Sequence, residues 1–317
     1  MTEATTLSAI EPISFRLYGQ DFAAFAKAIG ASFARYGFAV IGDHGLSQAK
    51  IDAANADTKA FFALPDAVKR CYQIEGVFGQ RGYTPFGTEI AKGAAHVDLK
   101  EFWHVGRELP PGHPNRVTMP DNVWPAEIPG FREHESWLYR ALEDLGDKML
   151  SAIAVYLGLD PGFFEPTTRD GNSVLRLLHY PPAPFDGPNV RAAAHEDINT
   201  ITLLLGAEEA GLELLDRGGQ WLPVNPPPGS VVCNIGDMLQ RLTNDVLPST
   251  THRVVNPPAE RRGVARYSTP FFLHFAPDYL IETLPGCITP DRPNRYPTPI
   301  TADAYLEERL KEIGLKT

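Results

Sequence analysis

The sequence holds little of what marks several large protein classes. Only three of its 317 residues are cysteines, and they lie far apart at Cys71, Cys233 and Cys287. A disulfide framework or a zinc ribbon needs more cysteines at closer spacing, and free thiols suit a reducing compartment. No apolar run approaches the roughly 20 residues of a membrane span, and the first residues lack the basic and apolar segments of a secretion signal. We therefore expect a cytoplasmic protein that does not associate with a membrane.

Positive charge is also scarce. The 29 lysines and arginines are outnumbered by 39 acidic residues, which gives a formal net charge of -10. Binding to the phosphates of a nucleic acid requires clustered Lys and Arg, so we expect no nucleic-acid partner, and no motif indicates a protein partner. With 43% hydrophobic and 21% charged residues, the composition is that of an ordinary globular protein with a sizeable core.

The pattern of hydrophobic residues changes near residue 170. Before that point, apolar residues recur at three- and four-residue steps and predict helices over 21–36, 47–62 and 131–157. From Gly171 onward, short strand-like runs alternate with turns, one of them at Gly236-Asp237. These runs predict strands over residues 174–180, 198–205, 212–216, 220–224, 230–235, 252–255 and 267–275. Many short strands joined by turns indicate a sandwich or a jelly-roll barrel.

This pattern predicts a mainly β fold with surrounding helices (α+β), arranged as one compact unit. We expect an N-terminal helical and mixed region over 1–170 and a catalytic β core over 171–280. A C-terminal extension with a helix should follow over 281–317. Two short strands, over 38–41 and 98–105, are expected within the N-terminal region.

The most informative stretch is Ala192–Leu205, where His195 and Asp197 stand before a β-branched run. On an extended chain, residues i and i+2 point to the same side. An imidazole and a carboxylate would therefore project together from one strand end. With a second histidine from elsewhere, they make the 2-His-1-carboxylate set, which holds iron(II) and leaves positions open for substrate and dioxygen.

The sequence contains a rival pair with the same spacing, His96 and Asp98. The segment after Asp98 offers no further ligand in a repeating pattern, whereas a clean strand follows Asp197 and gives it a rigid support. Downstream of His195, His252 heads an apolar strand, where the rim of a barrel could hold a ligand. Taken alone, a strand-borne histidine is more often a core residue than a metal ligand.

Beyond His252 lies the sequence's only Arg-x-Ser, Arg266-Tyr-Ser268. Arg266 and Ser268 would share one strand face. A guanidinium beside a hydroxyl suits a carboxylate, because Arg makes a bidentate, charge-assisted contact with it. The order His-x-Asp, distant His and then Arg-x-Ser, all on expected strands, is far more specific than any of its parts.

In these motifs the chain resembles the isopenicillin-N-synthase-like family of iron(II)- and 2-oxoglutarate-dependent oxygenases. The resemblance covers nearly the whole chain and includes residues 37–45, 61–65, 81–83, 178–182, 195–197, 234–237, 252–254 and 266–268. It implies a double-stranded β-helix (jelly-roll) core, with His195, Asp197 and His252 as the iron ligands. It also implies that Arg266 and Ser268 hold the distal carboxylate of 2-oxoglutarate, with Tyr180 nearby.

The activity implied by this resemblance is hydroxylation or desaturation of a small molecule, with dioxygen consumed and 2-oxoglutarate decarboxylated to succinate. Two alternatives stay open. One is an iron oxidase of the isopenicillin type that does not use 2-oxoglutarate, and the other is a non-catalytic barrel that binds a metal or a small molecule. The intact Arg266 and Ser268 favour the first activity, and the complete set of three ligands disfavours a non-catalytic barrel.

Strand alternation adds a candidate substrate-binding residue. The family's Asn-Tyr-Tyr-Pro motif lacks its Asn here, because Leu178 stands at that position, but Tyr180 is present. Positions 174, 176, 178 and 180 share a strand face, so an inward Tyr180 brings Arg176 inward as well. A buried guanidinium needs an anionic or carbonyl partner. That partner is either a structural Asp or Glu, or a carboxylate of the substrate, which would make the substrate an acid.

Overall fold

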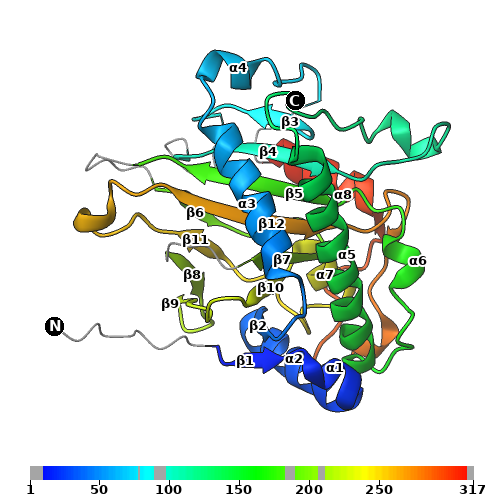
Figure 1. The fold of residues 1–317 in the computed structure, drawn as a ribbon. Coiled ribbons are helices and arrows are strands. Elements are labelled where there is room, and N and C mark those ends of the chain that lie inside the picture. Colours follow the sequence, from blue (N-terminus) through cyan, green and yellow to red (C-terminus); the bar gives the residue numbers. More distant parts are fainter. Residues whose placement is uncertain (1–9, 78, 89–97, 183–189, 206–210, 313–317) are drawn as a thin grey trace.

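The computed structural model describes residues 10–77, 79–88, 98–182, 190–205 and 211–312 (Figure 1). The elements before residue 170 are β1 (Pro12–Ser14), α1 (Arg16–Gln20), α2 (Phe22–Tyr36), β2 (Phe38–Gly42), α3 (Gln48–Phe62), α4 (Asp66–Arg70), β3 (Gly82–Thr84), β4 (Glu101–Gly106), the 3-10 turn η1 (Pro114–Val117), α5 (Phe131–Tyr156) and α6 (Glu165–Thr168). The later elements are β5 (Val174–Tyr180), β6 (Ala192–His195), β7 (Ile201–Leu205), β8 (Leu212–Leu215), β9 (Trp221–Pro223), β10 (Val231–Ile235), α7 (Asp237–Leu242), β11 (His252–Val254), η2 (Ala259–Arg261), β12 (Arg266–Leu273), β13 (Leu280–Ile281), η3 (Pro285–Cys287), β14 (Ile300–Thr301) and α8 (Ala302–Glu312).

The first long helix, α2, has clear start and stop signals in its sequence. The side chain of Asp21 caps it by accepting a hydrogen bond from the backbone N–H of Ala24 at 2.9 Å. Gly37 ends it in the left-handed region, with φ 68°. A Cβ at Gly37 would lie 2.2 Å from Oγ1 of Thr250, so glycine is needed for space as well as for conformation. The chain therefore turns directly from α2 into β2.

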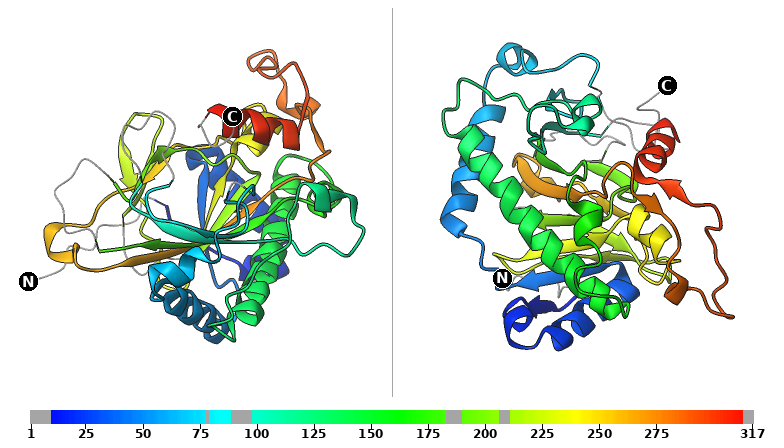
Figure 2. Two further views of the ribbon diagram at one scale, coloured as in Figure 1. Left: turned by 90° about the horizontal axis from the view of Figure 1, so that it is seen from above. Right: turned by 90° about the vertical axis from the view of Figure 1, so that its right-hand side faces the viewer.

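Two facing sheets form the double-stranded β-helix (jelly-roll) core. The larger sheet has the order β1-β2-β10-β7-β12-β5-β4-β3, and the smaller has the order β6-β11-β8-β9. Helices α2, α3 and α5 lie across the outer face of the larger sheet, and the smaller sheet lies on its other side (Figures 1 and 2). The larger sheet thus joins strands from both sides of residue 170.

Each strand of the larger sheet alternates between two environments. Outward residues such as Leu203 and Phe271 pack into the core beneath the helices. Inward residues such as Val40 and Val232 pack against Leu214 of the smaller sheet. Because apolar residues fill much of both faces, the polar residues on the inner face stand out as candidates for function.

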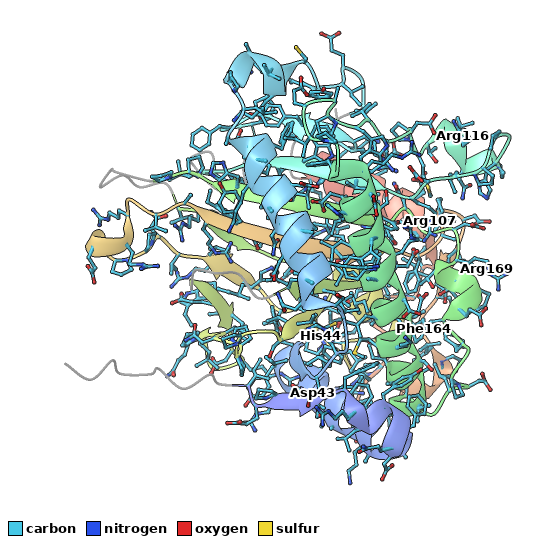
Figure 3. All side chains as sticks on the ribbon, in the orientation of Figure 1. Asp43, His44, Arg107, Arg116, Phe164 and Arg169 are labelled. Carbon is cyan, nitrogen blue, oxygen red and sulfur yellow. The ribbon has the colours of Figure 1, made fainter. Side chains whose placement is uncertain are left out.

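Helix α5 is tied to the sheet by polar contacts as well as by its apolar stripe. Arg107, just after β4, pairs with Glu143 of α5 and donates a hydrogen bond to the carbonyl of Gly171 at 2.8 Å (Figure 3).

In the described part of the chain, no helix is both long enough and apolar enough to cross a bilayer.

Most expected elements are present with ends shifted by one to three residues, and β5 has the expected bounds. Two differences from the expected elements lie next to each other in the structure. The turn expected at Gly236-Asp237 is the start of helix α7, and the strand expected over 198–205 begins only at Ile201. Both differences have one cause, because the N–H groups of Gly236 and Met238 donate to the carbonyls of Thr200 and Asn199 at 2.9 and 3.2 Å. Residues before β7 therefore bond to the start of α7.

Candidate metal centre and carboxylate-binding wall

The two sheets bring His195, Asp197 and His252 together. Each offers one ligand atom, and these three atoms lie within 4.8 Å of one another. Oδ1 of Asp197 is 3.8 Å from Nε2 of His195 and 3.8 Å from Nε2 of His252. His195 ends β6 and His252 begins β11, and the two residues are paired directly across these strands. One carboxylate oxygen and two imidazole nitrogens thus face a common point.

The sequence pattern suggested that His195 and Asp197 project together from one strand end, but this was wrong. His195 belongs to the smaller sheet, whereas Asp197 lies in the connection that leads to β7 in the larger sheet. The ligand atoms converge because the chain crosses between the sheets at this point. In the rival pair, His96 lies outside the described residues, whereas Asp98 is buried.

Backbone carbonyls fix the tautomer of both histidines. Nδ1 of His195 lies 2.7 Å from the carbonyl oxygen of Ala193, and Nδ1 of His252 lies 3.1 Å from that of Thr250. A carbonyl can only accept, so each Nδ1 carries a proton, and Nε2 is the nitrogen that offers a lone pair in the neutral ring. Histidine ligands of metals are typically oriented in this way.

The second oxygen of Asp197 is held by two donors. Oδ2 accepts hydrogen bonds from Oγ1 of Thr202 at 2.5 Å and from Nδ2 of Asn234 at 2.8 Å. These contacts leave Oδ1 turned toward the histidines and favour ligation through one oxygen. Sequence reasoning did not find these two residues. Two features of the sequence could have identified them: the inward position of Thr202 on its strand, and the Asn-Ile-Gly-Asp motif that begins at Asn234.

The electrostatics of the site favour a bound cation. Burial and the adjacent His252 lower the pKa of His195 to about 4, so its imidazole is neutral near pH 7. Burial alone would raise the pKa of Asp197, but His252, His195 and the two hydrogen bonds to Oδ2 hold it below its ordinary value. Two imidazoles and one carboxylate are the donor set expected for iron(II).

The inner face of the larger sheet carries the Arg-x-Ser pair close to Tyr180. Arg266 is paired with Tyr180, and Ser268 with Leu178, across β12 and β5. The guanidinium carbon of Arg266 lies 5.1 Å from the centre of the Tyr180 ring. Arg266, Ser268 and Tyr180 are all buried. A buried cation, a hydroxyl and a phenol on one wall can recognise a carboxylate.

Arg176 lies on the same inner face, as the alternation of β5 predicted. Its Nε donates to Nε2 of His104 at 2.6 Å, and its guanidinium lies over the rings of Phe102 and Phe272 at 4.3 and 5.3 Å. Nδ1 of His104 is 2.5 Å from the carbonyl oxygen of Gly79, so Nε2 is the accepting nitrogen. These contacts hold the guanidinium in one orientation.

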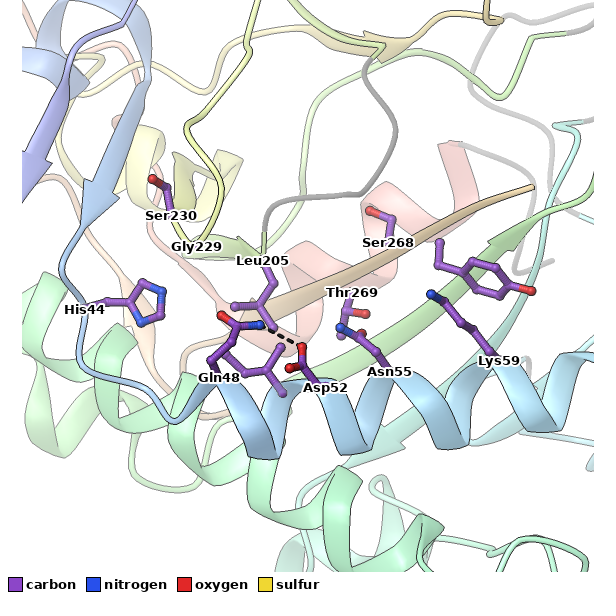
Figure 4. Close-up of a pocket in the computed structure, with 12 residues that line it drawn as sticks. His44, Gln48, Asp52, Asn55, Lys59, Leu205, Gly229, Ser230, Ser268 and Thr269 are labelled. Carbon is purple, nitrogen blue, oxygen red and sulfur yellow. Dashed lines mark hydrogen bonds between the residues drawn. The ribbon is translucent and has the colours of Figure 1, made fainter. Parts of the chain in front are cut away.

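A cavity of about 150 Å³ lies on the opposite, outer side of the larger sheet (Figure 4). It is bordered by α3 and by the ends of β7 and β12, and Gln48 donates to Asp52 at its edge at 2.8 Å. Its lining residues are His44, Gln48, Ile51, Asp52, Asn55, Lys59, Leu205, Gly229, Ser230, Tyr267, Ser268 and Thr269. None of the three candidate metal ligands lines this cavity, although Ser268 of the Arg-x-Ser pair does.

Two family models match the chain. The model for the 2OG-Fe(II) oxygenase superfamily matches residues 171–275. The model described as non-haem dioxygenase in morphine synthesis N-terminal matches residues 10–127. The first match contains all three candidate metal ligands and the Arg-x-Ser pair.

Individual relatives are similar over almost the whole chain. The 2-oxoglutarate-Fe(II) type oxidoreductase hxnY of Emericella nidulans is 35% identical over 309 residues, which cover 93% of this chain and 87% of that protein. The crystal structure of a protein of the 2OG-Fe(II) oxygenase family from Caulobacter crescentus has a TM-score of 0.91 and 66% identity, covering 97% of this chain and 100% of that chain. The crystal structure of a full-length Neurospora crassa protein in complex with alpha-KG and thymine has a TM-score of 0.85 and 29% identity, with 98% of both chains covered.

Proposed function

The chain belongs to the 2OG-Fe(II) oxygenase superfamily and is a non-haem iron(II)- and 2-oxoglutarate-dependent oxygenase, and we propose that His195, Asp197 and His252 hold its iron. One observation carries this assignment. The two Nε2 atoms and Oδ1 of Asp197 face one another, while the remaining polar atoms of these side chains are committed to other partners. When bound, iron(II) supplies the redox chemistry that activates dioxygen.

We propose that Arg266, Ser268 and Tyr180 bind 2-oxoglutarate. The guanidinium of Arg266 provides a charge-assisted contact for the carboxylate distant from the metal, and Oγ of Ser268 provides a neutral donor beside it. The ring of Tyr180 lies against this guanidinium and limits its orientation. These residues orient the cosubstrate and exclude water from the charged contact.

We propose that the substrate is a small molecule with an acidic group, and that Arg176 binds this group. The guanidinium is fixed by His104 and by two aromatic rings. Orientation by packing lowers the entropy lost when the side chain binds a ligand. The competing proposal is a structural role for Arg176 in holding β4 to β5.

The remaining proposals concern the division of the chain into regions, its compartment and its partners. We propose that residues 171–280 form the catalytic core and that residues 1–170 and 281–317 pack around it. We also propose a cytoplasmic enzyme without a nucleic-acid, membrane or protein partner, supported by three free cysteines and a formal net charge of -10.

Oxygen uptake with and without 2-oxoglutarate, measured beside succinate formation, tests the cosubstrate. We expect uptake and succinate to require both iron(II) and 2-oxoglutarate. Uptake that continues without 2-oxoglutarate would instead support an oxidase.

The substitution Arg176→Met tests the substrate proposal. In a screen of small acids, this variant should show a raised Michaelis constant for the substrate, while turnover of 2-oxoglutarate without substrate is retained. Loss of both activities together would favour the structural role for Arg176.

A further inference from the structure

The carboxylate of the rival His-x-Asp pair lies beside the proposed iron site. Asp98 is 4% exposed, and its Oδ2 lies 2.9 Å from Nζ of Lys100, which is 9% exposed. Removing two charges from water costs free energy that their attraction only partly returns. Stability alone therefore does not explain a buried ion pair at this position.

The other oxygen of Asp98 holds the strand that ends in His195. Oδ1 accepts a hydrogen bond from the backbone N–H of Ala193 in β6 at 3.2 Å. Strand β6 is at the edge of the smaller sheet, and its pairing with β11 is irregular. The N–H of Leu99 also donates to the carbonyl of Val190 at 3.3 Å. Residues 98–100 thus run beside β6, and Asp98 takes the place of a strand partner.

Ala193 connects this contact to the imidazole. Its N–H donates to Asp98, and its carbonyl accepts from Nδ1 of His195 at 2.7 Å. A small displacement of Ala193 therefore moves the group that sets the tautomer and the ring orientation of His195. Loss of a group that hydrogen-bonds directly to a histidine ligand, as the carbonyl of Ala193 does, typically weakens metal binding by about 10- to 100-fold.

We propose that Asp98, with its charge balanced by Lys100, is a positioning residue that holds Ala193 and so aims Nε2 of His195 at the metal. The inference rests on the proposed role of His195 as an iron ligand. Asp98 acts through the backbone and does not itself bind the metal.

Calorimetric titration of cobalt(II) into the metal-free full chain, without 2-oxoglutarate, tests the proposal independently of turnover. The variants are Asp98→Ala, Asp98→Asn, Lys100→Met and His195→Ala. The matched control is Lys69→Met. In the control pair, Nζ of Lys69 lies 2.7 Å from Oε2 of Glu101. Its side chains are as buried as those of the Lys100–Asp98 pair, with exposures of 9% and 4% against 10% and 5%. The control pair differs in lying on the outer face of the larger sheet. The visible spectrum of bound cobalt(II) reports the ligand geometry.

Asp98→Ala should weaken cobalt(II) binding by about tenfold or more and alter the spectrum. Asp98→Asn should weaken it less, because the amide oxygen still accepts from Ala193. Lys69→Met should lower the melting temperature while leaving the affinity of the folded protein unchanged. Should Asp98→Ala fail to fold, weaker binding by Lys100→Met and Asp98→Asn would support the proposal.

Unchanged affinity in the folded Asp98 variants would overturn the positioning role, as would an equal loss in Lys69→Met. The His195→Ala variant separates this failure from failure of the proposed iron site. If His195→Ala loses cobalt(II) while the Asp98 variants retain it, only the positioning role is wrong. If His195→Ala also retains it, the ligand assignment itself is wrong.

Discussion

The two sides of the larger sheet use buried carboxylates differently. On the outer face, Glu101 accepts from Nζ of Lys69 at 2.7 Å and from Tyr83, and its other oxygen lies 2.7 Å from Nδ1 of His179. On the inner side, Asp197 uses one oxygen for two donors and turns the other toward two histidines. The outer carboxylate is fully enclosed by its own partners, whereas the inner one has an oxygen directed at a possible ligand.

The pKa values alone do not reveal this difference. Burial would raise the pKa of both carboxyls, yet neighbouring side chains lower both. His179, Lys69 and Tyr83 do so for Glu101, and His252 and His195 lead for Asp197. The direction of the free oxygen therefore distinguishes a structural carboxylate from a candidate ligand.

The largest effect should come from His252→Ala, which removes one of three proposed ligands. Metal affinity should fall by more than about 100-fold, the upper end for residues that only support a ligand. Succinate formation should cease, while circular dichroism shows a folded protein. Retained cobalt(II) binding and activity would remove the distinction between the two faces.

A substitution on the outer face should lower stability but leave metal affinity unchanged. Glu101→Ala would leave the ammonium of Lys69 buried without its carboxylate, and breaking such a pair costs about 3–5 kcal/mol of stability. Urea unfolding should show this loss. Cobalt(II) affinity of the folded variant should stay close to that of the unaltered chain, and a loss as large as that of His252→Ala would contradict the comparison.

A smaller effect is expected at the carboxylate-binding wall. Arg266→Leu removes a charge-assisted contact worth about 1.5–3 kcal/mol, so the apparent affinity for 2-oxoglutarate should fall by roughly 10- to 150-fold. Ser268→Ala should cost about 1 kcal/mol. Titration of 2-oxoglutarate into the metal-loaded variants measures both. If Arg266→Leu binds 2-oxoglutarate as tightly as the unaltered chain does, Arg266 does not contact the cosubstrate.

A second carboxyl on the outer side gives a pH test. Glu135 of α5 is fully buried and accepts from Oγ1 of Thr58 at 2.9 Å. Burial raises its pKa well above the ordinary value. Between the unfolded and folded pKa values, the folded state binds more protons, so stability falls as pH rises, by about 1.4 kcal/mol per unit. Urea unfolding at several pH values should show that the free energy of unfolding of Glu135→Gln lacks this slope. The same pH dependence in the variant and in the unaltered chain would contradict the prediction.

The sequence was informative where local patterns decide the structure. The alternation in residues 174–180 predicted the strand that places Arg176 and Tyr180 on one face, which the structure confirms. The order of the motifs, together with the family resemblance, also pointed to His195, Asp197 and His252, whose ligand atoms the structure brings together.

Contacts between distant segments could not be predicted in this way. Sequence spacing placed His195 and Asp197 on one strand, because it does not reveal that the chain changes sheets between them. Asn234 and Asp98 were not assigned their contacts, since the partners lie 37 and 95 residues away. The helix that begins at Asp237 was missed for the same reason, because its start bonds to residues 197–200.

A crystal structure with manganese(II) and 2-oxoglutarate is the most direct test of the central claim. We expect one metal ion bonded to Nε2 of His195, Nε2 of His252 and Oδ1 of Asp197, with the distal carboxylate of 2-oxoglutarate on Arg266. A metal ion bound elsewhere, or 2-oxoglutarate in the cavity beside α3, would contradict the account.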